Sequence, residues 1–342
     1  MDQMARRATI KDVAERAGVS RAAVSKVLRN AYGLSDGMRI KVEAAMEALS
    51  YRPQTAARGL RGSTYTLGVV MPNISNPFYP DILDGIVHAL DGTQYQPLLG
   101  VRLSDERSEA SLVDTMMDRK LDGFIMIAPL FTHAYLSNLA KIVPTVIIGR
   151  HDREGGFDTV NNDDELGAQM VVDHFVSLGH RRIAHVGMEK LFEASDTNPP
   201  NIRLNGYLSA MCRHGLEQFV TVRDTTHGGG FEQDEQTFLE MLSGPERPTA
   251  VFAWMDTVAF HVMSAATSLG LRVPDDLSVA GYDNSRICNL RQLSLTSVDQ
   301  SAQLLGEKSA QLLLERIAGR DDDTHFVTVP KLCVRRSSGP PS

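Results

Sequence analysis

The segment TIKDVAERAGVSRAAVSKVLRN, residues 9–30, contains one short helix, a turn and the beginning of a second helix. Thr9 and Asp12 have the spacing of a capping box, and apolar residues then recur at helical spacing until Gly18, a residue type that often ends a helix. Ser20 is a favourable N-cap for the second helix. The apolar stripe of that helix consists of Val24, Val27 and Leu28. The segment therefore predicts a helix-turn-helix whose second helix begins at about Ser20.

The residues around this segment complete a small basic unit. Ser35 can cap a third helix that ends before Arg52-Pro53. Residues 1–62 contain 12 Lys and Arg against 6 Asp and Glu, so they carry +6 and leave −13 for the rest of a chain whose net charge is −7. A basic domain attached to an acidic body is typical of a protein that binds nucleic-acid phosphates through that domain.

The longer part of the chain alternates short apolar runs with amphipathic stretches. The apolar runs are LGVVM at 67–71, PLLGV at 97–101, GFIMIA at 123–128, TVIIG at 145–149, RIAHVG at 182–187, TAVFAWM at 249–255 and LSVAGYD at 277–283. Such runs are typical of buried parallel strands, and the stretches between them have helical spacing. The pattern predicts an α/β body of two doubly wound parallel sheets, one in each of two lobes.

Several functional classes find no support in the sequence. No run of 18 apolar residues occurs and the first 60 residues do not resemble a signal peptide, so we expect a cytoplasmic protein that does not insert into a membrane. The three cysteines lie far apart, which indicates reduced side chains rather than a disulfide frame or a metal site. Common nucleophile, phosphate-loop, dinucleotide and zinc motifs are absent, so we expect no enzymatic activity and no cofactor.

Both parts of the sequence resemble the LacI/GalR family of transcriptional regulators. The matching stretches are residues 9–30, residues 41–62, PNISNPFY at 72–79, VVDHFVSLGHRRIAHVG at 171–187, RLNGY at 203–207, GLRVPDDLSVAGYDN at 270–284, LTSVDQ at 295–300 and VRRSS at 334–338. The resemblance implies a three-helix headpiece in residues 1–53, a hinge helix in 54–62, and a periplasmic-binding-protein-like body in 63–342. Lobe one is expected at about 63–160 and 292–322, and lobe two at about 161–291 and 323–342. Three crossovers are expected near 158–162, 288–293 and 320–325.

The resemblance implies that the second helix lies in the major groove of double-stranded operator DNA. Arg21, Ala22 and Lys26 are then expected to read base edges, because Arg and Lys can donate to guanine O6 and N7 while Ala offers a methyl contact. The residues expected to contact phosphates are Ser20, Ser25 and Arg29.

The hinge helix is expected to bind the minor groove. Leu60 stands where the family has an apolar wedge, and the flanking Arg58 and Arg61 suit kinking of the DNA at the minor groove. Gly59 weakens this short helix, so we expect it to fold only on DNA.

A small-molecule effector is expected between the lobes, at the carboxyl ends of the strands. The residues expected to contact it are Asn76, Phe78, Tyr79, Arg150, Arg203, Met255 and Asp283, with Phe231 and Gln300 as further candidates. Arg203 can donate a planar fork and Asp283 can accept two hydroxyls. Two alternatives are that Arg203 and Asp283 pair with each other, and that Phe78 is an ordinary core residue.

Two departures from sugar-responsive relatives affect the nature of the effector. Met255 stands before Asp256 where these relatives usually have Asn, and Gly149-Arg150 stands where they often have Asp-Arg. Two typical hydroxyl partners are therefore missing. We expect a carbohydrate or a derivative, and the alternative is a non-sugar metabolite that is aromatic or anionic, which Arg150, Arg203 and Trp254 favour.

Two other classes of protein are alternatives for the whole chain. A solute-binding component of an uptake system would share the two-lobed body, but the basic headpiece favours a regulator. An enzyme would need a catalytic pair that no motif indicates.

A repressor is the expectation, and an activator is the alternative. The chain lacks the C-terminal leucine heptads of the family's tetramers, so we expect a homodimer on a near-palindromic operator.

Overall fold

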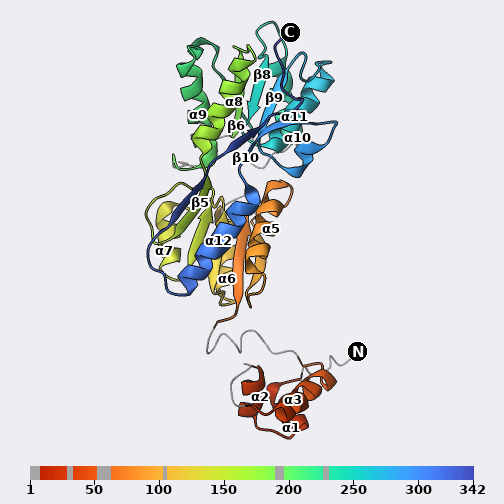
Figure 1. Ribbon diagram of the computed structural model, residues 1–342, viewed down its shortest axis with the longest axis vertical. Helices are drawn as coiled ribbons and strands as arrows, with labels where there is room; N and C mark the ends of the chain where they lie inside the picture. Colours follow the sequence, from red (N-terminus) through yellow and green to blue (C-terminus); the bar gives the residue numbers. More distant parts are fainter. Residues whose placement is uncertain (1–7, 29–33, 52–62, 103–105, 189–195, 226–230) are drawn as a thin grey trace. The chain divides into compact units, whose positions relative to one another are not determined.

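The computed structural model describes residues 8–28, 34–51, 63–102, 106–188, 196–225 and 231–342 (Figure 1). The chain separates into two compact units, Met1–Thr64 and Tyr65–Ser342. The expected hinge helix, with Arg58, Gly59 and Leu60, lies outside the described residues, as does Arg29. Among the helices that are described, none has both the length and the hydrophobicity to cross a bilayer.

The first unit is a three-helix headpiece. Its helices are α1 (Ile10–Ala17), α2 (Arg21–Leu28) and α3 (Asp36–Ala48). The predicted capping box is present at Thr9 and Asp12, and Gly18 closes α1 with a φ of 67°. Ser35 accepts a hydrogen bond from the backbone N–H of Met38 and so caps α3. The buried side chains between the helices are Val13, Ala14, Val24, Val27, Val42 and Ala45. The predicted helix-turn-helix is confirmed.

Lobe one of the second unit is a parallel α/β layer structure. Its sheet has the order β11-β5-β4-β3-β1-β2, and every neighbouring pair is parallel. The strands are β1 (Thr66–Met71), β2 (Gln96–Val101), β3 (Gly123–Ile127), β4 (Thr145–Ile148), β5 (Asp158–Asn162) and β11 (His325–Thr328). The helices are α5 (Phe78–Leu90), α6 (Glu106–Met117), α7 (His133–Ala140) and α12 (Ala302–Ile317).

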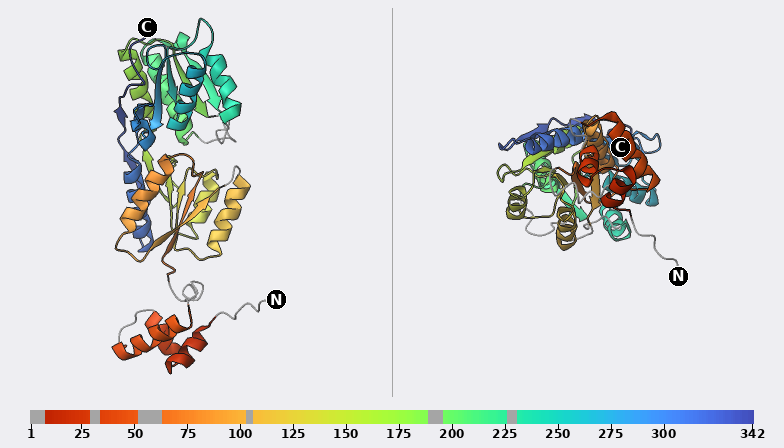
Figure 2. Two further views of the ribbon diagram at one scale, coloured as in Figure 1. Left: turned by 90° about the vertical axis from the view of Figure 1, so that its right-hand side faces the viewer. Right: turned by 90° about the horizontal axis from the view of Figure 1, so that it is seen from below.

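Alternate residues of these strands face opposite helix layers. In β1, Leu67 and Val69 belong to the core that contains α5 and α12, whereas Val70 belongs to the core that contains α6 and α7. Both faces of the sheet are therefore buried, which explains the uninterrupted apolar runs in the sequence. Figure 2 shows the sheet of lobe one between these two helix layers.

Lobe two repeats this arrangement. Its sheet has the order β12-β10-β9-β8-β6-β7, parallel except for the antiparallel edge strand β12. The strands are β6 (Ile183–Met188), β7 (Thr221–Thr225), β8 (Ala250–Ala253), β9 (Ser278–Asp283), β10 (Thr296–Asp299) and β12 (Lys331–Cys333). The helices are α8 (Asp164–Ser177), α9 (Pro199–Arg213), α10 (Phe231–Leu242) and α11 (Asp256–Ser268), with short 3-10 turns η1 (Glu217–Phe219) and η2 (Arg286–Asn289). The predicted two doubly wound sheets are confirmed.

The chain passes between the lobes after β5, after β10 and after β11. The first passage lies close to the expected position, but the expected lobe boundaries near 292 and 322 are wrong. β10 pairs with β9 and therefore belongs to lobe two, while β11 pairs with β5 and therefore belongs to lobe one. Both passages come several residues later than expected, because the short strands β10 and β11 each extend a sheet before the chain crosses.

Two glycines let α5 and α12 approach closely in lobe one. A Cβ atom added at Gly85 would lie 2.0 Å from the carbonyl oxygen of Gln303, and one added at Gly306 would lie 2.0 Å from that of Ile82. The two helices lie side by side in Figure 1. This contact holds α12 against lobe one although it follows β10 of lobe two.

Candidate functional site

Helix α2 presents the predicted base-reading residues to solvent. Arg21, Ala22 and Lys26 are exposed, whereas Val24 and Val27 of the same helix are buried against α1 and α3. The apolar stripe thus fixes which face of α2 is free. Of the residues expected to contact phosphates, Ser20 caps the helix, because its Oγ accepts a hydrogen bond from the backbone N–H of Ala23 at 3.1 Å. Ser25 is half-buried.

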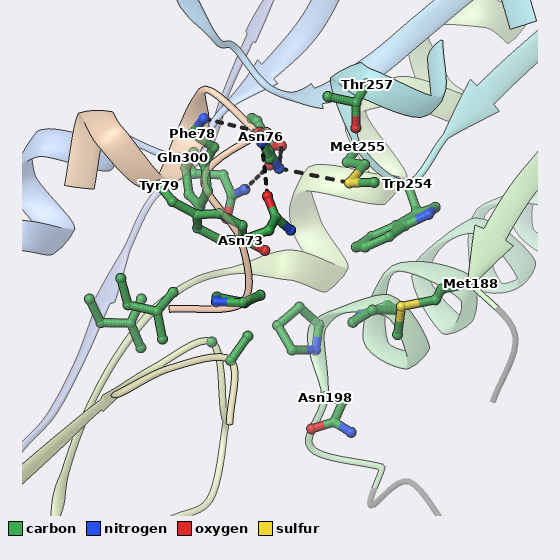
Figure 3. A pocket seen from close by; sticks show the side chains of 18 of the residues that line it. Asn73, Asn76, Phe78, Tyr79, Met188, Asn198, Trp254, Met255, Thr257 and Gln300 are labelled. Atoms are coloured by element: carbon green, nitrogen blue, oxygen red, sulfur yellow. Dashed lines mark hydrogen bonds between the residues drawn. The ribbon is translucent and has the colours of Figure 1, made fainter. Parts of the chain in front are cut away.

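A cavity of about 590 Å³ lies between the two lobes at the carboxyl ends of both sheets (Figure 3). The predicted residues that line it are Asn76, Phe78, Tyr79, Arg203, Met255, Asp283 and Gln300. The chain brings them together because they follow strands or lie in the first turns of helices at the carboxyl edges of the two sheets, where the ligands of parallel sheets bind.

Asp283 stands at the centre of the polar contacts. Its Oδ1 accepts a hydrogen bond from Gln300 Nε2 at 2.6 Å, and its Oδ2 accepts one from Asn76 Nδ2 at 3.2 Å. Asn76 belongs to lobe one, so the second bond joins the lobes. Burial of Asp283, with the nearby Asp256 carboxylate, raises its pKa well above the usual value. Its φ of 116° places the residue in a region of backbone strain that is common at functional sites.

Arg203 is buried, and each of its three guanidinium nitrogens donates one hydrogen bond. Its Nε donates to Asp164 Oδ1 at 2.7 Å, its Nη1 to the carbonyl oxygen of Trp254 at 2.7 Å, and its Nη2 to Gln300 Oε1 at 3.2 Å. The guanidinium lies 3.7 Å from the centroid of the Tyr282 ring. The structure does not have the alternative pairing of Arg203 with Asp283. Arg203 forms its ion pair with Asp164. Gln300 lies between Arg203 and Asp283 and is hydrogen-bonded to both.

The ion pair keeps Asp164 charged. Burial acts to raise the pKa of this carboxyl, but Arg203, and then His151 at 2.9 Å, outweigh burial and hold the pKa below its usual value.

The aromatic residues of lobe one lie beside these polar groups. Phe78 lines the cavity and also packs into the core with α12, so the alternative of a core role is correct in part. Its ring centroid lies 6.0 Å from that of Tyr79. Burial, with Asp283 nearby, raises the pKa of Tyr79 to about 12, so this phenol keeps its proton as a donor.

One expected residue, Arg150, does not reach the cavity. Arg150 is not among the lining residues: its Nε donates to Asp152 Oδ2 at 2.8 Å and its Nη1 donates to the carbonyl oxygen of Phe131 at 2.9 Å. The structure therefore does not bring Arg150 to the cavity, because the Asp152 carboxylate holds its side chain inside lobe one. The side chain of Phe231 lies outside the described part of the structure.

Sequence reasoning missed several lining residues. Arg102 follows β2, donates from Nη1 to the carbonyl oxygen of Ala128 at 2.7 Å, and lies 3.7 Å from Glu109 Oε2. Met188 ends β6, and Pro199 opens α9. The position of Arg102 and Met188 at the ends of predicted strands was a usable signal. In the described ranges, no group of three or more His, Cys, Asp or Glu could hold a metal ion.

Comparison with known proteins assigns the family. A model of bacterial regulatory proteins of the lacI family matches residues 9–54, and a periplasmic binding protein-like domain matches residues 172–338. The ribose operon repressor of Escherichia coli (strain K12) is 32% identical over 317 residues, which cover 91% of this chain and 93% of that protein. The chain belongs to the LacI family. It is therefore a DNA-binding transcriptional regulator, and the resemblance stated from its motifs is confirmed.

Solved structures agree with this assignment. The lac repressor dimer bound to operator and the anti-inducer ONPF is similar with a TM-score of 0.82 and 26% identity, over 98% of this chain and 100% of that one. A LacI family transcriptional regulator from Enterococcus faecium with bound ribose is similar with a TM-score of 0.69 and 28% identity, over 80% of this chain and 99% of that one. Headpiece and body thus both follow the LacI family architecture.

Proposed function

We propose that the protein is a repressor whose affinity for its operator is controlled by a small molecule bound between the lobes. The observation that carries the proposal is the cavity at the carboxyl ends of both sheets, where Asn76 of lobe one bonds to Asp283 of lobe two. A ligand that competes for these groups changes the contact between the lobes. Relatives such as the ribose operon repressor support repression rather than activation.

Operator recognition belongs to the exposed face of α2. Arg21 and Lys26 donate to base edges in the major groove and Ala22 makes an apolar contact, while Ser20, Ser25 and Arg29 contact phosphates. Arg58 and Leu60 engage the minor groove. The protein acts as a homodimer on a near-palindromic site, which the dimeric state of the operator-bound lac repressor supports. The protein acts in the cytoplasm, which contains the bacterial DNA.

The effector is a carbohydrate or a derivative. The hydrogen-bonding groups of Asp283, Arg203 and Gln300 suit vicinal hydroxyls, and the ribose-bound relative from Enterococcus faecium supports the same class. The cavity serves binding and not catalysis, because Arg203 and Asp164 are already paired with each other. A non-sugar aromatic metabolite is the second candidate, which the indole of Trp254 in the cavity wall favours.

Operator titration tests the DNA-binding half of this proposal. A site is first selected from a random duplex library with the full-length protein. Lys26→Ala should then weaken binding to that site by about 1–3 kcal/mol and relax the preference at one base pair. Lys41→Ala, an exposed lysine on α3, is the matched control and should leave base preference unchanged. An equal loss for Lys26→Ala on selected and random DNA would contradict the assignment of the reading face.

A further inference from the structure

The loop that follows β4 in lobe one contacts lobe two beside the cavity. The backbone N–H of His151 donates to the carbonyl oxygen of Thr197 at 3.0 Å, and Thr197 Oγ1 donates to Asp152 Oδ2 at 3.4 Å. His151 Nε2 also lies 2.9 Å from Asp164 Oδ2. Thr197 precedes α9 and Asp164 opens α8, so both belong to lobe two. We call these contacts, of His151 and Asp152 with Asp164 and Thr197, the clasp.

The clasp depends on how the lobes are arranged. Asp164 follows β5 by two residues, so the crossover itself keeps this residue near lobe one. Thr197 is far from each of the three crossovers in the sequence, and its bonds to His151 and Asp152 form only when the lobes bring it there. A rotation that moves Thr197 away therefore also releases the backbone of His151.

The clasp contains a histidine, the residue type whose charge changes between about pH 5 and 8. The side chain of His151 is 22% exposed and can exchange a proton with water, whereas that of Asp164 is 2% exposed. Burial acts to raise the pKa of Asp164, but Arg203 and His151 outweigh burial and hold the pKa below its usual value. A protonated imidazole therefore meets a charged carboxylate, and this charge-assisted hydrogen bond is stronger than one from a neutral imidazole.

The neighbouring charges leave Asp164 as the carboxylate that responds to a proton on His151. The charged groups around His151 are Asp164 on α8, Arg203 on α9, Arg150 and Asp152 in its own loop, and the exposed Asp196 before α9. Arg203 bonds to Asp164 Oδ1 while His151 bonds to Oδ2, so the carboxylate lies between the two. Arg150 and Asp152 form an ion pair with each other at 2.8 Å.

A series of hydrogen bonds connects the clasp to the cavity. It leaves lobe one at His151, passes through four side chains of the lobe-two side, and returns to lobe one at Asn76. Figure 3 shows its far end, where Gln300 and Asn76 lie together. The members are, in order, His151, Asp164, Arg203, Gln300, Asp283 and Asn76. The lobes are therefore joined at both ends of one polar network.

We propose that the clasp is a proton-dependent contact between the lobes: protonation of His151 strengthens it and favours the arrangement of the lobes in this structure. The protein then responds to pH as well as to an effector, because both act on contacts between the same two lobes. The consequence for operator affinity rests on the proposed function, in which the lobes control DNA binding. The clasp itself does not rest on it.

Two substitutions fix the charge at position 151. His151→Gln is neutral at every pH and can still donate to Asp164, whereas His151→Lys stays charged between about pH 5 and 8. The wild type should match His151→Lys at pH 5.5 and His151→Gln at pH 8.5. His214→Gln is the matched control, because His214 Nε2 lies 2.6 Å from Asp173 Oδ1 and both residues belong to lobe two.

Pulsed EPR measures the arrangement of the lobes in the full-length protein without DNA or effector. One spin label is attached to the native Cys212, which is exposed on α9, and the other to the thiol of Asp91→Cys at the exposed end of α5. Cys333→Ser removes a half-buried thiol, and excess unlabelled protein suppresses distances between chains.

The population ratio of the lobe arrangements should change about two- to fivefold from pH 8.5 to pH 5.5 in the wild type, the range for a partly exposed ion pair. The same change should appear in His214→Gln and be absent from both variants of His151. An unchanged ratio in the wild type, or an equal change in His151→Gln, would overturn the proposal.

Operator affinity of the same proteins tests the coupling to DNA separately. The ratio of the wild-type Kd to that of His151→Gln should change about two- to fivefold between the two pH values. The wild type at pH 5.5 should differ from His151→Gln in the same direction as His151→Lys does. A pH-dependent EPR result with a constant Kd ratio would support the clasp and contradict the proposed control of DNA binding by the lobes.

Discussion

Lobe one and lobe two have sheets of the same strand order, yet they contribute different chemistry to the cavity between them. Lobe two supplies the buried ion pair of Arg203 with Asp164 and the carboxyl of Asp283. Lobe one supplies an amide and two aromatic rings from the start of α5 and the turn before it, and Arg102, which follows β2. The shared strand order places equivalent strand ends around the cavity, and the lobes differ in the residues at those ends. Lobe two thus contributes the carboxyl of Asp283, and lobe one contributes Asn76, which contacts Asp283 across the cavity.

The largest effect should come from breaking the ion pair of lobe two. Arg203→Ala leaves the carboxylate of Asp164 buried with only His151 beside it, so it should lower the free energy of unfolding of the body by about 3–5 kcal/mol. Urea denaturation measures this change. Arg213→Ala, on the same helix α9 but exposed beside Asp173, is the matched control and should cost about 0–1 kcal/mol. Similar small losses in both variants would show that Asp164 does not depend on Arg203.

A smaller difference should appear between the helix contacts of the two lobes. Gly85→Ala places a Cβ 2.0 Å from a backbone oxygen of α12, whereas Gly206→Ala in lobe two places one 2.7 Å from the backbone oxygen of Glu165. Overpacking of this kind costs about 1–3 kcal/mol, and Gly85→Ala should lie at the upper end. Thermal unfolding compares the two variants. Gly37→Ala in α3 meets open space and should leave the unfolding of the body unchanged; a larger loss for Gly206→Ala than for Gly85→Ala would reverse the comparison.

Two buried carboxyls should give the lobes opposite pH dependence. In lobe one, burial acts to raise the pKa of Asp158, but hydrogen bonds from Arg320 and Arg316 outweigh burial and lower the pKa. Its contribution to stability is present above the unfolded-state pKa of about 3.9 and is lost as the pH falls through the lower folded value. In lobe two, burial raises the pKa of Asp283, so its contribution is present below about 3.9 and is lost as the pH rises through the higher folded value.

Asparagine variants measure these contributions separately. Asp158→Asn should be less stable than the wild type at neutral pH, and the difference should narrow as the pH falls below about 3.9. Asp283→Asn should gain stability relative to the wild type as the pH rises from about 4, because the amide never ionises. Urea denaturation from pH 3 to 9 gives both curves. Parallel curves for the two variants would mean that both carboxyls are ionised alike.

The parts of the fold that follow from local pattern were predictable from the sequence. The capping box at Thr9 and the strand runs of both lobes depend on residues near one another in the chain, and the structure has them. The lobe boundaries depend on which distant strand a short strand pairs with. β10 has the polar sequence TSVD, and its pairing with β9 and β12 cannot be derived from its own residues.

The same distinction applies to the candidate site. Asn76, Asp283 and Gln300 lie in motifs at strand ends, so their position at the cavity could be predicted. Arg150 also follows a strand, yet the carboxylate of Asp152 turns it into lobe one, a contact that depends on side-chain packing. The ion pair of Arg203 with Asp164 joins residues on two different helices. The sequence predicted Arg203 as a hydrogen-bond donor to the ligand, but it could not predict this buried partner.

The smallest effect should come from the exposed contact between the lobes at η2. Arg286 of lobe two lies 2.7 Å from Asp81 Oδ1 and 2.5 Å from Asp84 Oδ2, both on α5 of lobe one. Because the side chain of Arg286 is 66% exposed, water and salt screen this contact strongly. Arg286→Ala removes a contact that holds the cavity walls together, so it should raise the Kd of a cavity ligand by less than about fivefold at low salt. The increase should disappear in about 1 M salt, where charges are screened within about 3 Å. Arg272→Ala removes a similarly exposed arginine whose partners Asp275 and Asp276 both lie within lobe two, and it should leave the Kd unchanged. If both variants change the Kd equally, the effect comes from net charge and not from the contact between the lobes.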